Sequence, residues 1–125
     1  MWSTHAALMA FVPVTDMARA RAFYEGTLGL TVRTGDDYGC LLNAQGSLLR
    51  LALVGEFERP PHTVLGWSVG DIAASVQALA ARGVVFHRYD GMVQDELGIW
   101  VAPSQDRVAW FPDSEGNTLS LTQPV

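Results

Sequence analysis

The fold of this chain is decided by the stretch Phe111-Pro112-Asp113-Ser114-Glu115-Gly116-Asn117-Thr118-Leu119-Ser120-Leu121-Thr122-Gln123, which predicts a strand, a tight turn and a second strand. The Asp113 side chain can bond the backbone two residues on, and Gly116-Asn117 tolerates positive φ, so the chain reverses there. In the second strand, leucines alternate with hydroxyl-bearing residues. We expect the leucine face to pack in the core and the hydroxyl face to meet a cavity or water.

Length and composition limit the classes of protein and partner. The 125 residues, 49% of them hydrophobic, suffice for one compact domain and hardly for two. The net charge is −5 and the eight basic residues are scattered, so nucleic acid and acidic membrane surfaces are not expected as partners. The single cysteine, Cys40, favours a cytoplasmic location. The N-terminus does not resemble a targeting segment, and no apolar run is long enough to cross a bilayer.

The first half predicts a strand, a helix and three further strands. The apolar residues 7–14 predict a strand, and Asp16 is suited to cap the helix that follows. From Met17 the apolar residues recur at three- and four-residue steps, with Gly26 and Gly29 as candidate ends of the helix. Three short antiparallel strands are expected at residues 30–33, 38–43 and 47–54.

The second half repeats this order, which indicates an internal duplication. Val14-Thr15-Asp16-Met17-Ala18 matches Val69-Gly70-Asp71-Ile72-Ala73, and each segment follows an apolar strand and opens an amphipathic helix. The predicted elements are a strand at 64–69, a helix from Ile72 closed by Gly83, strands at 84–89 and 99–101, and the closing hairpin. The predicted fold class is α+β, with two βαβββ modules that form a curved mixed sheet around a cup and carry their helices outside.

The expected organisation is a single domain over residues 1–125. Module 1 covers about residues 7–54 and module 2 about residues 63–123. The proline-rich, polar residues 55–62 link the two modules, because paired prolines disfavour both a helix and an inner strand.

The sequence resembles the vicinal oxygen chelate superfamily, which includes glyoxalase I, bleomycin- and fosfomycin-resistance proteins and extradiol dioxygenases. The residues that carry this resemblance are Val14-Thr15-Asp16, Phe23-Tyr24, Leu28-Gly29-Leu30 and the hairpin segment Phe111–Leu119. The resemblance extends from Ala7 to Gln123 and implies the two-module fold and a homodimer. It does not imply one activity, because this scaffold hosts unrelated chemistries and non-catalytic binders.

The resemblance also implies positions for a divalent metal ion, and this sequence departs from the family there. The positions that usually carry the ligands hold Met9, Val64 and Ser120. A thioether, an isopropyl group and a hydroxyl do not replace the anionic or imidazole donors that such an ion needs. We therefore expect a site without metal and a chain without a cofactor. His62, His5 and Glu115 are the residues from which another metal site would be built, but each suits a solvated loop, a chain end or a turn better.

A second motif belongs to a different class of enzyme. Gly66-Trp67-Ser68-Val69-Gly70 matches the G-x-S-x-G pattern that places a nucleophilic serine between a strand and a helix. Ser68 comes too early for the sharp turn, however, and no histidine follows His87 to act as its partner. A serine hydrolase is the most remote of the alternatives.

Alternation along the strands predicts the lining of the cup. On the strand 47–54, Leu49, Leu51 and Leu53 face the helices, which leaves Arg50 for the cup. Arg50 would bind a carboxylate or phosphate of a ligand, or pair with an acidic side chain. The two tryptophans would wall an aromatic pocket or belong to the core or a dimer interface. The expected ligand-binding residues are Met9, Phe11, Arg50, Val64, Ser68, Trp100, Trp110 and Ser120.

Such a lining suits a small, partly aromatic organic molecule, which favours binding or sequestration as in the bleomycin-resistance proteins. The alternative is a glyoxalase- or dioxygenase-like enzyme, either metal-dependent through unusual ligands or metal-free. No residue is assigned a catalytic role; the candidate acid/base groups are Tyr38, Cys40, His87, Tyr89, Asp95 and Glu96. The irregular residues 90–98, with Gly91 and Gly98 as hinges, would cover the pocket.

Overall fold

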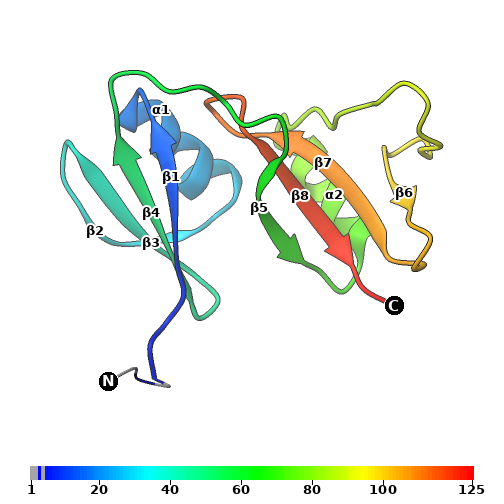
Figure 1. Ribbon diagram of the computed structural model, residues 1–125, viewed down its shortest axis with the longest axis horizontal. Helices are drawn as coiled ribbons and strands as arrows, with labels where there is room; N and C mark the ends of the chain where they lie inside the picture. Colours follow the sequence, from blue (N-terminus) through cyan, green and yellow to red (C-terminus); the bar gives the residue numbers. More distant parts are fainter. Residues whose placement is uncertain (1–2, 4) are drawn as a thin grey trace. The chain divides into compact units, whose positions relative to one another are not determined.

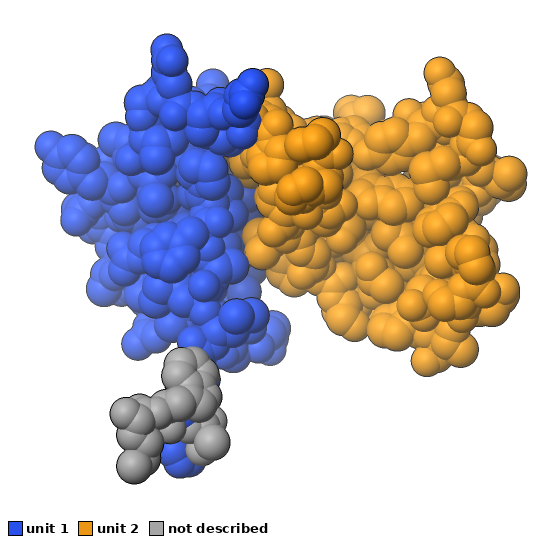
Figure 2. Space-filling model, in the orientation of Figure 1, with its two compact units in different colours: residues 1–58 blue, residues 59–125 orange. Residues whose placement is uncertain are grey.

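Two compact units make up the chain, Met1–Glu58 and Arg59–Val125 (Figure 2). The structure, a computed structural model, describes residues 3 and 5–125. Met1, Trp2 and Thr4, part of the N-terminal segment on which the expectation about targeting rests, lie outside the described residues. No helix in the described part of the chain is long and apolar enough to cross a membrane.

Unit 1 is a four-stranded mixed sheet with one helical segment (Figure 1). Its strands lie in the order β1-β4-β3-β2, with β1 parallel to β4 and the other neighbours antiparallel. The elements in chain order are β1 (Met9–Val14), α1 (Met17–Arg21), the π-helical segment η1 (Ala22–Thr27), β2 (Thr31–Gly35), β3 (Gly39–Ala44) and β4 (Ser47–Leu53).

The helical segment of unit 1 begins where the sequence predicts. Asp16 accepts a hydrogen bond from the backbone N–H of Arg19 at 3.0 Å and so caps α1. The helix does not stop at Gly26, which lies inside η1. It closes after Leu28, whose N–H donates to the Phe23 carbonyl, and Gly29 follows with a φ of 75°.

Unit 2 repeats the order and the strand directions of unit 1, which confirms the predicted α+β class with two βαβββ modules. Its strands lie in the order β5-β8-β7-β6, with β5 parallel to β8. Asp71 caps the helix by accepting from the N–H of Ala74 at 3.0 Å, and the helix lies against one face of the sheet (Figure 1). The elements are β5 (Thr63–Ser68), α2 (Ile72–Ala81), β6 (Trp100–Val101), β7 (Arg107–Pro112) and β8 (Thr118–Gln123).

The predicted strand at residues 84–89 is wrong. This segment has no regular structure, and the short β6 takes its place in the module. The reason is the Gln94 side chain, which accepts from the Tyr89 N–H at 2.8 Å and donates to the His87 carbonyl at 3.0 Å. These are backbone groups that a neighbouring strand would otherwise bond. One bond to the sheet remains, from the His87 N–H to the Trp110 carbonyl at 2.8 Å.

The closing hairpin forms as predicted. Asp113 accepts hydrogen bonds from the backbone N–H groups of Glu115 and Asn117 at 2.8 and 2.9 Å, and Gly116 adopts a φ of 83°. Leu119 and Leu121 are buried, as expected for the core face of β8.

The core of each unit lies between its sheet and its helix. Leu53, which was expected on the helix side, is exposed instead, because it is the last residue of β4. The buried apolar residues are Val12, Val14, Ala20, Tyr24, Cys40, Leu42, Leu49 and Leu51 in unit 1, and Ile72, Val76, Ile99, Ala109, Phe111, Leu119 and Leu121 in unit 2.

Candidate functional site

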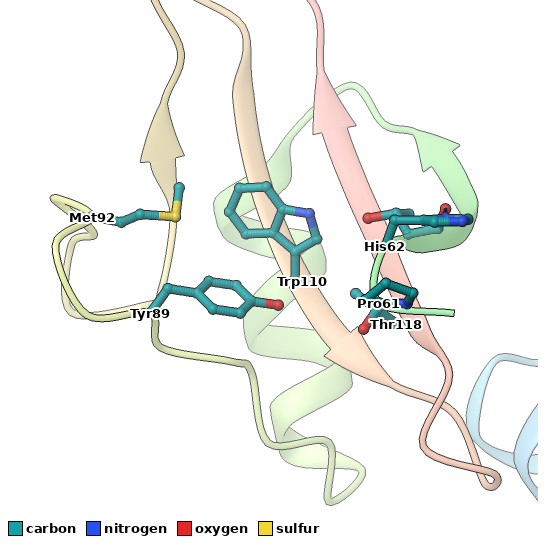
Figure 3. A pocket seen from close by; sticks show the side chains of 7 residues that line it. Pro61, His62, Tyr89, Met92, Trp110 and Thr118 are labelled. Atoms are coloured by element: carbon teal, nitrogen blue, oxygen red, sulfur yellow. Dashed lines mark hydrogen bonds between the residues drawn. The ribbon is translucent and has the colours of Figure 1, made fainter. Parts of the chain in front are cut away.

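A pocket of about 360 Å³ lies on the sheet of unit 2. Its lining comes from the end of the linker, the start of β5, the loop after α2, and strands β7 and β8. In the view of Figure 3, Tyr89 and Met92 lie on one side of Trp110, and His62, Pro61 and Thr118 lie on the other. The lining residues are Pro61, His62, Thr63, Tyr89, Met92, Trp110 and Thr118.

The pocket occupies the sheet face opposite to α2. On β7, Ala109 and Phe111 are buried in the core, so alternation turns Trp110 to the other face. On β8, Thr118 alternates with the buried Leu119 and lines the pocket. The hydroxyl face of the closing strand thus borders a cavity at Thr118.

An aromatic cluster forms the wall of the pocket. The rings of Tyr89 and Trp110 meet edge to face, with centroids 5.5 Å apart and planes at 83°. Trp100 packs against Trp110 from the neighbouring strand with centroids 5.9 Å apart, although it does not line the pocket itself. Met92 adds a polarisable thioether to this wall.

His62 is the imidazole in the pocket, and one of its nitrogens is already engaged. Its Nδ1 lies 3.0 Å from the backbone carbonyl oxygen of Thr63. A carbonyl only accepts hydrogen bonds, so Nδ1 carries the hydrogen and donates. In the neutral imidazole the lone pair therefore lies on Nε2.

A second imidazole contacts the pocket through Tyr89. The His87 Nδ1 lies 3.0 Å from the Tyr89 hydroxyl, and the two rings meet at 87°. Burial lowers the pKa of the His87 imidazole below its ordinary value. Burial also raises the pKa of the Tyr89 phenol. Both side chains are accordingly uncharged near pH 7.

Side-chain hydrogen bonds stabilise the loop that carries Met92. Arg88 donates to the carbonyl oxygens of Asp95 and Glu96 at 2.7 and 2.6 Å. Asp95 accepts from the N–H groups of Leu97 and Ile99, both at 2.9 Å. These bonds favour a loop that forms a fixed wall of the pocket. That residues 90–98 move as a cover, with Gly91 and Gly98 as hinges, stays a prediction.

Several of the residues predicted from sequence lie at or beside this pocket. Trp110 lines it, and Ser120 is the strand neighbour of both Trp110 and Gly66. Val64 follows the lining residue Thr63 at an irregularity between β5 and β8. Ser68 is exposed at the end of β5 and belongs to the strand rather than to a sharp turn, which does not favour a nucleophile.

The predicted residues Met9, Phe11 and Arg50 lie in unit 1 and do not line this pocket. Phe11 is 65% exposed and is the strand neighbour of Arg50. Among the described residues, Arg50 has no hydrogen-bond or ion-pair partner. The pKa of Asp36 is lowered mainly by the backbone N–H groups of Tyr38 and Gly39, with a small contribution from Arg50.

Sequence reasoning missed four lining residues, Pro61, Thr63, Tyr89 and Met92, and weighed His62 only as a metal ligand. The sequence predicts Tyr89 on a strand. Whether Met92 comes close to the pocket depends on the path of an irregular loop. The clustering of aromatic residues at 86, 89, 100 and 110 was the available signal. The other acid/base candidates do not line the pocket: Tyr38 is exposed, and Cys40 is buried, which raises the pKa of its thiol.

The donors at the family's metal positions do not fit a divalent ion. Met9, Val64 and Ser120 offer a thioether, an isopropyl group and a hydroxyl. Over the described residues, no three His, Cys, Asp or Glu side chains are grouped closely enough to hold a metal. Glu115, a candidate for a rebuilt site, is buried in the hairpin turn, where Arg59 Nε donates to its carbonyl oxygen; His5 is exposed near the chain end.

Comparisons with known proteins agree with this architecture. Residues 4–121 match the family model described as Glyoxalase/Bleomycin resistance protein/Dioxygenase superfamily. No curated protein matches the chain.

Solved structures show the same fold at low sequence identity. A superfamily member from Sphaerobacter thermophilus shares 22% identity with a TM-score of 0.72, covering 94% of this chain and 96% of that one. A glyoxalase family protein from Bacillus anthracis shares 15% with a TM-score of 0.75, covering 100% and 99%. A lactoylglutathione lyase from Agrobacterium tumefaciens shares 13% with a TM-score of 0.73, covering 95% and 93%. At these identities the likeness concerns the fold alone.

Proposed function

This chain belongs to the Glyoxalase/Bleomycin resistance protein/Dioxygenase superfamily, and from that premise we propose that it binds a small, partly aromatic organic molecule. The binding site is the pocket of unit 2 around Trp110, Tyr89 and Met92. The role is binding or sequestration, of the kind that the bleomycin-resistance branch of the superfamily suggests.

The observation that carries this proposal is the aromatic wall of the pocket. Trp110 and Tyr89 meet edge to face, with ring centroids 5.5 Å apart, on the sheet face opposite to α2, with Met92 beside them. The volume of about 360 Å³ falls within the range of small-molecule pockets. A planar ligand would stack on these rings and contact the thioether, while the hydroxyl of Thr118 and the imidazole of His62 would orient its polar groups.

Isothermal titration calorimetry of the purified protein with 2-naphthol tests this proposal. We expect saturable binding that the substitution Trp110→Leu weakens by about tenfold, because the ligand loses its main aromatic contact. Phe11→Leu is the matched control, since Phe11 is exposed in unit 1 and does not line the pocket. Absence of binding, or equal losses in the two variants, would contradict the proposal.

A second candidate function is a metal-free enzyme, and the observation that favours it is the fixed orientation of His62. With Nδ1 donating to the Thr63 carbonyl, the Nε2 of neutral His62 is left to accept a proton from a bound substrate. Turnover of a bound ligand, lost in His62→Gln while binding is retained, would support this enzyme over the binder.

The proposal includes a site that works without a metal, because the donors at Met9, Val64 and Ser120 do not suit one. Elemental analysis should find no stoichiometric divalent ion, and chelation should leave ligand binding unchanged. A homodimer, implied by the family resemblance, and a cytoplasmic location, suggested by the single cysteine, are also part of the proposal. Sedimentation analysis tests the dimer.

A further inference from the structure

We propose that Tyr89, held by His87, gives the pocket a hydrogen-bond acceptor that selects uncharged aromatic ligands carrying an O–H or N–H donor. This inference rests on the proposed function, because it names the class of ligand that the same pocket would take. It makes Tyr89 a specificity-determining residue and His87 a positioning residue.

The pair is held in place from several sides. The His87 Nδ1 lies 3.0 Å from the Tyr89 hydroxyl. The His87 N–H donates to the Trp110 carbonyl of β7 at 2.8 Å, and Gln94 bonds both the His87 carbonyl and the Tyr89 N–H. The phenol ring also rests edge to face on Trp110. The hydroxyl oxygen is therefore presented to a ligand in a fixed position.

The direction of the hydrogen bond between His87 and Tyr89 decides whether Tyr89 offers a ligand a hydrogen-bond donor or an acceptor. His87 is neutral at pH 7, because burial disfavours its charged form. A phenol is a stronger acid than the N–H of a neutral imidazole, so the Tyr89 O–H donates and the His87 Nδ1 accepts. With its hydrogen used in this way, the Tyr89 oxygen has only lone pairs left for a ligand.

The other polar groups of the pocket agree with this selectivity. The Nδ1 hydrogen of His62 is used by the Thr63 carbonyl, which leaves a lone pair on Nε2 in the neutral ring. Thr118 has a hydroxyl that both donates and accepts. None of the described residues that line the pocket is an arginine or a lysine, so a carboxylate ligand would lose its hydration without gaining a cationic partner.

Three naphthalenes of similar shape test the inference with the full chain. 2-Naphthol carries an O–H donor, 2-methoxynaphthalene lacks it, and 2-naphthoate is anionic. At pH 7 we expect naphthol to bind about fivefold more tightly than the methoxy compound, the effect of one hydrogen bond. Naphthoate should bind most weakly.

Two variants and a matched control assign the preference to a residue. Tyr89→Phe keeps the ring and removes the hydroxyl, so naphthol should fall to the affinity of the methoxy compound, which itself should change little. Tyr38→Phe makes the same change at an exposed tyrosine of unit 1 that does not line the pocket, so this matched control should leave the preference intact. His87→Phe frees the Tyr89 O–H to donate, so the preference should shrink through tighter binding of the methoxy compound.

The outcomes separate this inference from the function on which it rests. Equal binding of naphthol and methoxynaphthalene by the unmodified protein would overturn the inference and leave the binding function standing. A preference that survives Tyr89→Phe, or disappears in Tyr38→Phe, would overturn it as well. Failure of all three naphthalenes to bind would overturn the proposed function together with the inference.

Discussion

At the scale of single residues, His87 and Tyr89 show how burial and one contact set the chemistry of a side chain. An isolated imidazole titrates near neutral pH, but burial favours the uncharged form of His87. Burial also raises the pKa of the Tyr89 phenol, which is protonated near pH 7 in any case. The two groups thus become a fixed donor and acceptor at the edge of a pocket.

The lowered pKa of His87 predicts that stability depends on pH. Below an unfolded-state pKa of 6.5 the unfolded chain binds a proton that folded His87 resists, so this contribution to the free energy of unfolding decreases as pH falls below that value. The contribution is fully present above it. Urea unfolding at pH 7 and pH 5 should show a smaller decrease for His87→Phe than for the unmodified chain. An equal or larger decrease in the variant would contradict the assignment to His87.

At the scale of elements, the two helix starts and the closing turn were predictable because their determinants are local. The side chains of Asp16 and Asp71 each accept a hydrogen bond from the backbone N–H three residues ahead. The Asp113 side chain accepts from the backbone N–H groups two and four residues ahead. The strand predicted at 84–89 failed because its backbone groups are bonded by Gln94, from beyond the segment itself. No periodicity within residues 84–89 contains that information.

The cap of α2 gives a prediction at this scale. Asp71→Ala removes the acceptor for the Ala74 N–H and should lower the free energy of unfolding by about 1 kcal/mol. Asp71→Asn, which keeps a side-chain oxygen, should lower it by much less. Urea unfolding measures both variants, and equal losses would show that the hydrogen bond is not the cause.

The hairpin turn gives a second prediction about stability. Gly116 has a φ of 83°, and a methyl group there would lie 3.0 Å from Arg59 Nε, so Gly116→Ala should lower the free energy of unfolding by about 2 kcal/mol. Gly46 has a similar φ of 86° with open space around it, and Gly46→Ala should cost about half as much. Thermal and urea unfolding compare the two. A larger loss at Gly46 would contradict the role of the Arg59 contact.

At the scale of the whole molecule, the sequence predicted the architecture better than the site. The repeated order of elements and the turn motif specify two βαβββ modules, because hydrophobic alternation and turn chemistry follow the chain. The pocket depends instead on an irregular loop and on residues from the linker end, β7 and β8. Trp110 was predicted as a pocket wall because it and Trp100 lie on adjacent strands, whereas Tyr89 and Met92 depend on hydrogen bonds distant in sequence.

The most direct test of the central claim is a ¹H–¹⁵N spectrum of the tryptophan indoles during titration with 2-naphthol. Trp110 lines the pocket, whereas Trp67 stacks on Phe111, whose side chain packs on the other face of the sheet. We predict a saturable shift of the Trp110 indole signal and little change at Trp67. A Trp110 signal that stays in place at saturating naphthol, or a larger shift at Trp67, would contradict a binding site at this pocket.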